Sequence, residues 1–238
     1  MLNSARMLSC TLLIAMATCW SPVAQAQDGE ELPHGWFMDV QRYHPTFDTL
    51  GGFQVESTQA LELWHPAFGL TFNYANRPLA WYDRTTEGRE FGGALVANMF
   101  AMDLQAAIGF RYADFGIMVP VTLAMKSKTD EIPGFPTLDE SYAGAGDIRF
   151  AVKGRILDPT AGPIGLGILL PLSLPTGNSW VYNGSYGATF TPQILVETLQ
   201  GRFHAALNIG PHLTSTVRYL DPDGEEVIRN GPEFRMGL

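Results

Sequence analysis

Histidine is the commonest metal ligand in proteins, so the histidines are the first candidates for a functional site. His204 and His212 lie in a stretch that alternates like a strand, and roughly 3.4 Å per residue separates them by about 27 Å. Two side chains that far apart cannot share a metal ion. We therefore predict no metal site and no cofactor. The sequence contains five histidines: His34, His44, His65, His204 and His212.

The sequence gives only weak support for a nucleophilic catalytic site or for a calcium-binding loop. Ser173 and Ser179 could serve a lipid-acting hydrolase, but no motif ties either serine to a histidine. The segment DPDGEE (221–226) crowds four carboxylates around an Asp-Gly turn. It lacks the full calcium-loop spacing with a terminal bidentate Glu. We predict no catalytic residue, and a lipid-active barrel enzyme is the third hypothesis for the function.

Charged side chains of both signs recur at alternate positions of predicted strands, most clearly in GDIRFAVKGRIL (146–157). Side chains alternate faces along a strand, so these charges share one face. We expect that face to point into a lumen, where Glu197 and Glu233 are the nearest candidates to pair with the cations of 146–157. The predicted lumen-facing residues are Asp147, Arg149, Lys153, Arg155, Glu197, Arg202, His204, Glu233 and Arg235.

The opposite face of each predicted strand is apolar. A soluble sandwich would turn this face inward, whereas a transmembrane barrel turns it toward lipid and places polar side chains in the lumen. Alternation alone fits both arrangements. For a barrel, the predicted lipid-facing residues include Phe68, Phe72, Val119, Phe150, Ile168, Leu170 and Leu207.

Strand length and turn pattern favour the barrel. Most predicted strands exceed the roughly 9–11 residues that a tilted strand needs to cross hydrocarbon, and no segment has a helical period. Short turns near 111–112, 158–162 and 200–201 alternate with longer ones near 84–90, 128–144, 177–186 and 218–225, as in outer-membrane barrels. The predicted strands are 62–83, 91–110, 113–127, 145–157, 163–176, 187–199, 202–217 and 226–238.

The N-terminus is typical of a secretory signal peptide. Arg6 precedes a mostly apolar stretch, and Ala24-Gln25-Ala26 forms a small-x-small cleavage site. Both cysteines lie in this leader, so the exported chain has neither a disulfide nor a thiolate metal site. The formal net charge of −9 excludes a nucleic-acid partner. We predict a signal peptide (1–26), an extended periplasmic segment or plug (27–60) and a barrel domain (61–238).

Several motifs resemble a family of bacterial outer-membrane barrels. They are DVQRYHP (39–45), GGFQVEST (51–58), YANRPL (74–79), GAGDIRFAVKGRIL (144–157), LPLSLPTGN (170–178) and AALNIG (205–210). Such barrels often precede an OmpA-type peptidoglycan-binding domain. The resemblance implies a barrel and a link to peptidoglycan through a domain that lies outside this chain. It carries over no catalytic residue.

We therefore expect an all-β antiparallel meander that closes as a transmembrane outer-membrane β-barrel, with about eight strands present. Either the barrel closes at eight strands, or further strands follow Leu238. The expected function is a non-enzymatic envelope protein or a narrow channel for small solutes, with outer-membrane lipid as its partner. The alternative is a secreted soluble β-barrel or sandwich that binds a ligand.

Overall fold

A computed structural model of the chain describes residues 39–85, 88–127, 141–220 and 226–238. These ranges contain strands and one 3-10 turn, η1 (Ser179–Val181). No helix within them is long and apolar enough to cross a membrane. The strands are β1 (Pro66–Thr85), β2 (Gly88–Phe110), β3 (Ala113–Ser127), β4 (Tyr142–Ala145), β5 (Arg149–Leu157), β6 (Gly165–Ser173), β7 (Thr189–Phe190), β8 (Gln193–Gln200), β9 (Phe203–His212), β10 (Val217–Leu220), β11 (Glu226–Asn230) and β12 (Glu233–Gly237).

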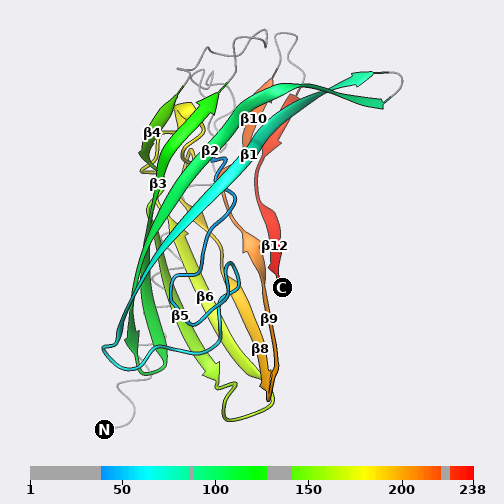
Figure 1. The fold of residues 1–238 in the computed structure, drawn as a ribbon. Helices are drawn as coiled ribbons and strands as arrows, with labels where there is room; N and C mark the ends of the chain where they lie inside the picture. Colours follow the sequence, from blue (N-terminus) through cyan, green and yellow to red (C-terminus); the bar gives the residue numbers. More distant parts are fainter. Residues whose placement is uncertain (1–38, 86–87, 128–140, 221–225) are drawn as a thin grey trace. The chain divides into compact units, whose positions relative to one another are not determined.

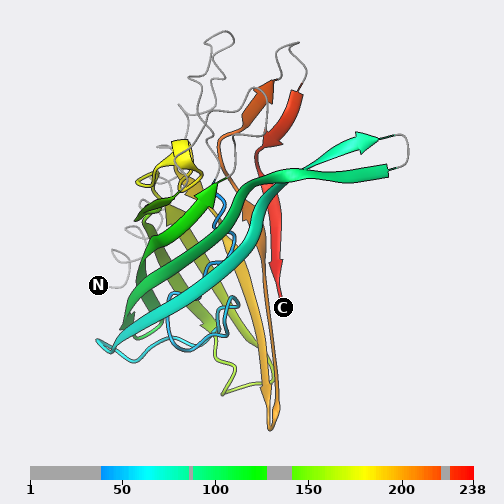
Figure 2. The same ribbon diagram turned by 45° about the horizontal axis from the view of Figure 1, so that its top comes forward.

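Eight strands form one antiparallel sheet in the order β1-β2-β3-β5-β6-β8-β9-β12. The short strands β4 and β7 pair with β3 and β6, and β10 and β11 form a separate hairpin. The sheet curls into an open half-barrel, which can be followed in Figures 1 and 2. The predicted all-β antiparallel meander of eight main strands is therefore confirmed.

The β1–β2 hairpin is the longest element, and its register runs from Pro66 opposite Ile108 to Thr85 opposite Gly88. The register shifts between Asn76 and Leu79, where Pro78 has no backbone N–H for the ladder. Such a bulge bends a strand pair. Figure 2 shows the far part of this hairpin turning away from the rest of the sheet.

Two connections at one rim of the sheet are tight turns, as the sequence predicts. Residues 111–112 join β2 to β3, with Arg111 in the left-handed region (φ 50°), and residues 201–202 join β8 to β9. Gly201 occupies the left-handed region (φ 64°) without the steric penalty of a Cβ atom.

Some predicted strands are interrupted in the structure. The predicted strand 145–157 begins at Arg149, because the backbone N–H groups of Gly146 and Ile148 donate to Pro120 O and Thr176 Oγ1 instead of extending the β5 ladder. The predicted strand 226–238 divides into β11 and β12 at Gly231-Pro232, where proline has no N–H to donate. The predicted strand 202–217 is also interrupted: β9 ends at His212, and β10 begins at Val217.

Residues 39–62 lie against the concave face of the sheet and supply much of its core. Phe47 packs with Met118, Ala151, Leu169 and Leu195, which come from four different strands. A glycine makes this approach possible, because a Cβ atom on Gly116 of β3 would lie 2.8 Å from the Phe47 Cβ. We call residues 39–62 the inner segment.

Two further hydrophobic clusters hold the two ends of the inner segment against the sheet. Near its start, Val40 packs with Val96, Met99 and Tyr182, and the Val40 N–H donates to Tyr182 O at 3.1 Å. Near its end, Leu61 packs with Ala67 and Ala107. The core of this protein therefore lies between the inner segment and the sheet.

Candidate functional site

Large apolar side chains cover the convex face of the sheet. Phe68 and Phe72 of β1 are 75% and 55% exposed, and the Phe72 ring stacks on Phe100 of β2. In β6, exposed and buried residues alternate from Gly167 to Ser173, with Ile168 and Leu170 among the exposed ones. Of the other predicted lipid-facing residues, Val119, Phe150 and Leu207 are half-buried.

The concave face carries buried charge, and its centre is Lys153 of β5. The Lys153 ammonium forms an ion pair with Asp48 of the inner segment and lies 3.3 Å from the Asp114 carboxylate of β3. Asp114 also accepts a hydrogen bond from the Leu61 N–H at 2.9 Å. A buried charge must be paired and hydrogen-bonded to be tolerated, and these contacts meet that condition while joining the inner segment to the sheet.

A second buried carboxylate, Glu197 of β8, holds the inner segment at another point. Its Oε2 accepts hydrogen bonds from the Ser57 hydroxyl (2.8 Å), the Thr58 N–H (2.8 Å) and the Thr58 hydroxyl (2.7 Å). Its Oε1 lies 2.7 Å from Nε2 of His204. Charge-assisted hydrogen bonds of this kind are stronger than neutral ones.

These pairings correct the sequence-based expectation that Glu197 and Glu233 neutralise the cations of 146–157. Lys153 pairs with Asp48 and Asp114, and Glu233 pairs with Arg235 of its own strand at 2.7 Å. The inner segment supplies the counter-charge because it lies between the facing strands.

Other predicted lumen-facing residues lie near the ends of strands. Arg155 pairs with Asp158 at 2.9 Å in the turn after β5. Arg202 lies exposed in the β8–β9 turn, and the His204 side chain is 51% exposed. Arg202 therefore lies in the turn and not on the wall of the lumen, whereas His204 lies near the start of β9, where its ring contacts the buried Glu197 carboxylate.

Asp147 is buried, but it lies in the connection before β5. Its carboxylate oxygens accept hydrogen bonds from the Gly177 N–H at 2.9 Å and the Ser185 N–H at 2.7 Å. Asp147 therefore fixes the loop between β6 and β8 instead of pairing with a cation across the lumen.

Glu56 of the inner segment is an acid whose pKa is strongly raised in this interior. Burial, together with the nearby charge of Asp48, raises the pKa of Glu56 to about 8. Its Oε1 accepts the Phe47 N–H, while its buried Oε2 has no hydrogen-bond partner. At neutral pH this carboxyl is therefore mostly protonated.

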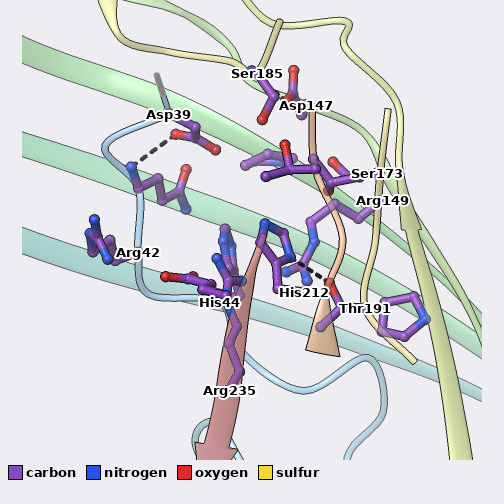
Figure 3. A pocket seen from close by; sticks show the side chains of 16 residues that line it. Asp39, Arg42, His44, Asp147, Arg149, Ser173, Ser185, Thr191, His212 and Arg235 are labelled. Atoms are coloured by element: carbon purple, nitrogen blue, oxygen red, sulfur yellow. Dashed lines mark hydrogen bonds and ion pairs between the residues drawn. The ribbon is translucent and has the colours of Figure 1, made fainter. Parts of the chain in front are cut away.

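A polar cavity of about 80 Å³ opens between the start of the inner segment and the sheet. Figure 3 shows side chains from several elements pointing into it, among them Arg149 of β5, His212 of β9 and Arg235 of β12. Buried hydroxyl groups complete the wall, and the Thr191 hydroxyl lies 2.7 Å from Nδ1 of His212. The lining residues labelled in the figure are Asp39, Arg42, His44, Asp147, Arg149, Ser173, Ser185, Thr191, His212 and Arg235.

Burial shifts the titration of two inner-segment residues at this cavity. The pKa of His44 falls well below its ordinary value because the ring is buried and faces the positive charges of Arg149 and Arg235. Burial and, to a smaller extent, the charge of Asp147 raise the pKa of Asp39 to about 7, although the Gln41 N–H opposes this shift. His44 is therefore neutral at pH 7, and the Asp39 carboxyl is more readily protonated than an ordinary aspartic acid.

Within the described ranges, no group of three or more His, Cys, Asp or Glu side chains is arranged to hold a metal ion. Ser173 lines the cavity together with His44 and His212, but no hydrogen bond connects it to a histidine there. The DPDGEE segment, except for Glu226, and His34 lie outside the described residues, as does the predicted signal peptide.

Sequence reasoning missed the acidic inner-segment residues of this interior, chiefly Asp48 and Glu56, and named His44 only as a possible metal ligand. They lie in a stretch without strand alternation, so no periodicity indicates which way their side chains point. The available signal was compositional: acidic residues and Phe47 lie close to Gly51-Gly52, upstream of the first strand.

Comparison of the chain with protein-family models, with curated proteins and with solved structures finds no match.

Proposed function

We propose that this chain is a non-enzymatic outer-membrane β-barrel protein whose lumen is occupied by its own inner segment. The observation that carries the proposal is the exposed apolar convex face of the sheet, combined with charged groups buried on the concave face. Its convex face exposes Phe68, Phe72 and Ile168, whereas its concave face buries Lys153 and Glu197. In a transmembrane barrel, lipid covers the apolar outer face and polar groups fill the interior.

The inner segment favours a closed lumen over an open channel. An eight-stranded barrel has an interior just wide enough for side chains to fill. Here Phe47 occupies part of that space, and the Lys153–Asp48 and Glu197–Thr58 contacts tether the segment on two strands. An envelope structural protein therefore fits the geometry better than a channel for bulk solute flow.

Cell fractionation tests the membrane assignment. We expect the full chain in the outer-membrane fraction, resistant to extraction with urea, and with faster gel migration before boiling than after. Release into the soluble periplasmic fraction would contradict the proposal and favour the secreted ligand-binding barrel.

Planar-bilayer recording tests the closed lumen with a matched pair of glycine variants. We expect no large steady conductance from the natural protein. Gly116→Leu should raise conductance, because its side chain would displace Phe47. Gly154→Leu on the neighbouring strand is the control, since no heavy atom lies within 4 Å of a Cβ atom there. A large steady conductance from the natural protein would indicate an open pore.

A further inference from the structure

The polar cavity contains an arginine, Arg149, that forms no ion pair with any carboxylate of the described residues. Arg149 of β5 contacts the Phe47 ring (5.4 Å to its centroid) and the Met118 sulfur (3.8 Å), both of which are uncharged. The nearby Arg235 guanidinium repels Arg149, whereas the carboxyl groups of Asp39, Asp103 and Glu56 attract it. Figure 3 shows the Arg149 and Arg235 side chains directed into the cavity.

The acids around the cavity are engaged elsewhere. Asp147 accepts hydrogen bonds from two loop N–H groups, and Glu233 pairs with Arg235. Asp39 accepts the Gln41 N–H at 2.9 Å. Arg42 is an additional cation at the cavity's edge. The lining therefore holds three arginines and three carboxyl groups, and the hydrogen bonds and ion pairs of those carboxyl groups go to partners other than Arg149.

Uncharged donor groups lie beside the two guanidinium groups. The buried Nδ1 of His44 has no hydrogen-bond partner, although a buried polar atom normally has one. The hydroxyl groups of Ser173, Thr189 and Thr191 are buried in the same wall. A guanidinium with neighbouring N–H and O–H donors is the arrangement that recognises carboxylate and phosphate oxygens.

We propose that this cavity binds a small oxyanion, a carboxylate or phosphate group, with Arg149 as its principal cation and His44 and Arg235 as further donors. The volume of about 80 Å³ has room for several water-sized groups, at roughly 10–15 Å³ each, which matches either oxyanion in size. The site goes beyond the proposed function, because it depends on the interior of the fold and not on lipid around it.

Isothermal titration of the full chain, folded in detergent micelles, tests the site. The probes are sodium acetate and sodium phosphate, with sodium chloride at equal ionic strength as the reference. We expect saturable binding at one site, at least tenfold weaker binding in Arg149→Gln, and unchanged binding in the control Arg202→Gln, which removes an exposed cation outside the cavity. Preference for acetate would identify the ligand group as a carboxylate, and preference for phosphate would identify it as a phosphate.

Two results would overturn the proposal: no saturable binding of either probe to the natural protein, or equal affinity in Arg149→Gln. If Arg149→Gln does not fold, Arg235→Gln takes its place with the same expected loss. The ring-nitrogen resonances of His44 in the natural protein give a second measurement. They should shift on saturation with the bound probe, and unchanged resonances would place the binding elsewhere.

Discussion

Lys153 of β5 and Asp48 of the inner segment form an ion pair in which only 4% and 1% of the two side chains are exposed. The two residues are 105 positions apart in the sequence. Burial of both charges costs solvation energy that their mutual attraction and further hydrogen bonds must offset. The pair therefore makes the position of the inner segment and the stability of the sheet depend on each other.

Replacement of Lys153 by methionine should destabilise the protein strongly. In Lys153→Met, Asp48 and Asp114 stay buried without their cation, and breaking a buried pair in this way costs about 3–5 kcal/mol. Urea unfolding in detergent micelles measures the loss of unfolding free energy. Lys126→Met, at an exposed position of β3, should change it by less than about 0.5 kcal/mol. Equal stability of the two variants would contradict the structural role of the pair.

Removal of the Thr58 hydroxyl should loosen the end of the inner segment. Thr58→Val deprives the buried Glu197 carboxylate of one of its donors, at a cost of about 1–3 kcal/mol. Hydrogen exchange should become faster at the Thr58 amide, which also donates to Glu197. The control is Thr216→Val, an exposed threonine before β10. Unchanged exchange at Thr58 would mean that the hydroxyl does not hold the segment.

The unfolding free energy should fall as pH rises from about 5 to 8. The pKa of Glu56 is about 8 in the folded protein, compared with an ordinary value of 4.5. The folded state therefore binds more protons than the unfolded state between these values, so stability is lost as pH rises through this window. The slope for one group is at most about 1.4 kcal/mol per pH unit.

Glu56→Gln should flatten this pH dependence and unfold at higher urea concentration than the natural protein at pH 8. The amide oxygen can still accept the Phe47 N–H, so the hydrogen bond is retained. Urea midpoints at pH 5.5 and pH 8 provide the measurement, with Glu62→Gln, an exposed change nearby, as the control. Parallel pH profiles for Glu56→Gln and the natural protein would contradict the assignment.

Substitution of arginine for an apolar residue on the convex face distinguishes a membrane barrel from a soluble protein. Ile168→Arg should impair outer-membrane assembly, because a charge near the bilayer midplane costs about 2–4 kcal/mol. Ala161→Arg, in the exposed turn after β5, should assemble normally. Heat-modifiable gel migration reports assembly. In a soluble protein, Ile168 is already 41% exposed to water, and both variants would fold equally well.

Sequence reasoning worked best where side chains alternate. The strand predicted at 113–127 has the same first and last residues as β3. Its apolar residues Phe115, Ile117 and Val119 alternate with residues that face the other side of the sheet. It worked less well where local hydrogen bonding interrupts a strand. Asp147 belongs to the same alternating stretch as Lys153, yet its carboxylate binds loop N–H groups from residues 30 and 38 positions away.

The alternation of residue types in the sequence could not predict which residues pair with the buried charges. Alternation gives the face on which Lys153 lies, but it gives no register between a strand and an irregular segment. The path of the inner segment brings Asp48 to Lys153 and Thr58 to Glu197. That path depends on the packing of Phe47 and Leu61 against residues distant in the sequence. A single sequence contains no periodic signal for such contacts.

The tether between Ser57 and Glu197, which spans 140 positions, also constrains the order of folding. Contacts between residues so distant in sequence form late, because the loop-closure entropy is lost before such contacts contribute. The inner segment precedes every strand of the described residues, but Glu197, one of the carboxylates that anchor it, arrives only with β8. We therefore expect the part of this interior that is synthesised first to be among the last to reach its final position.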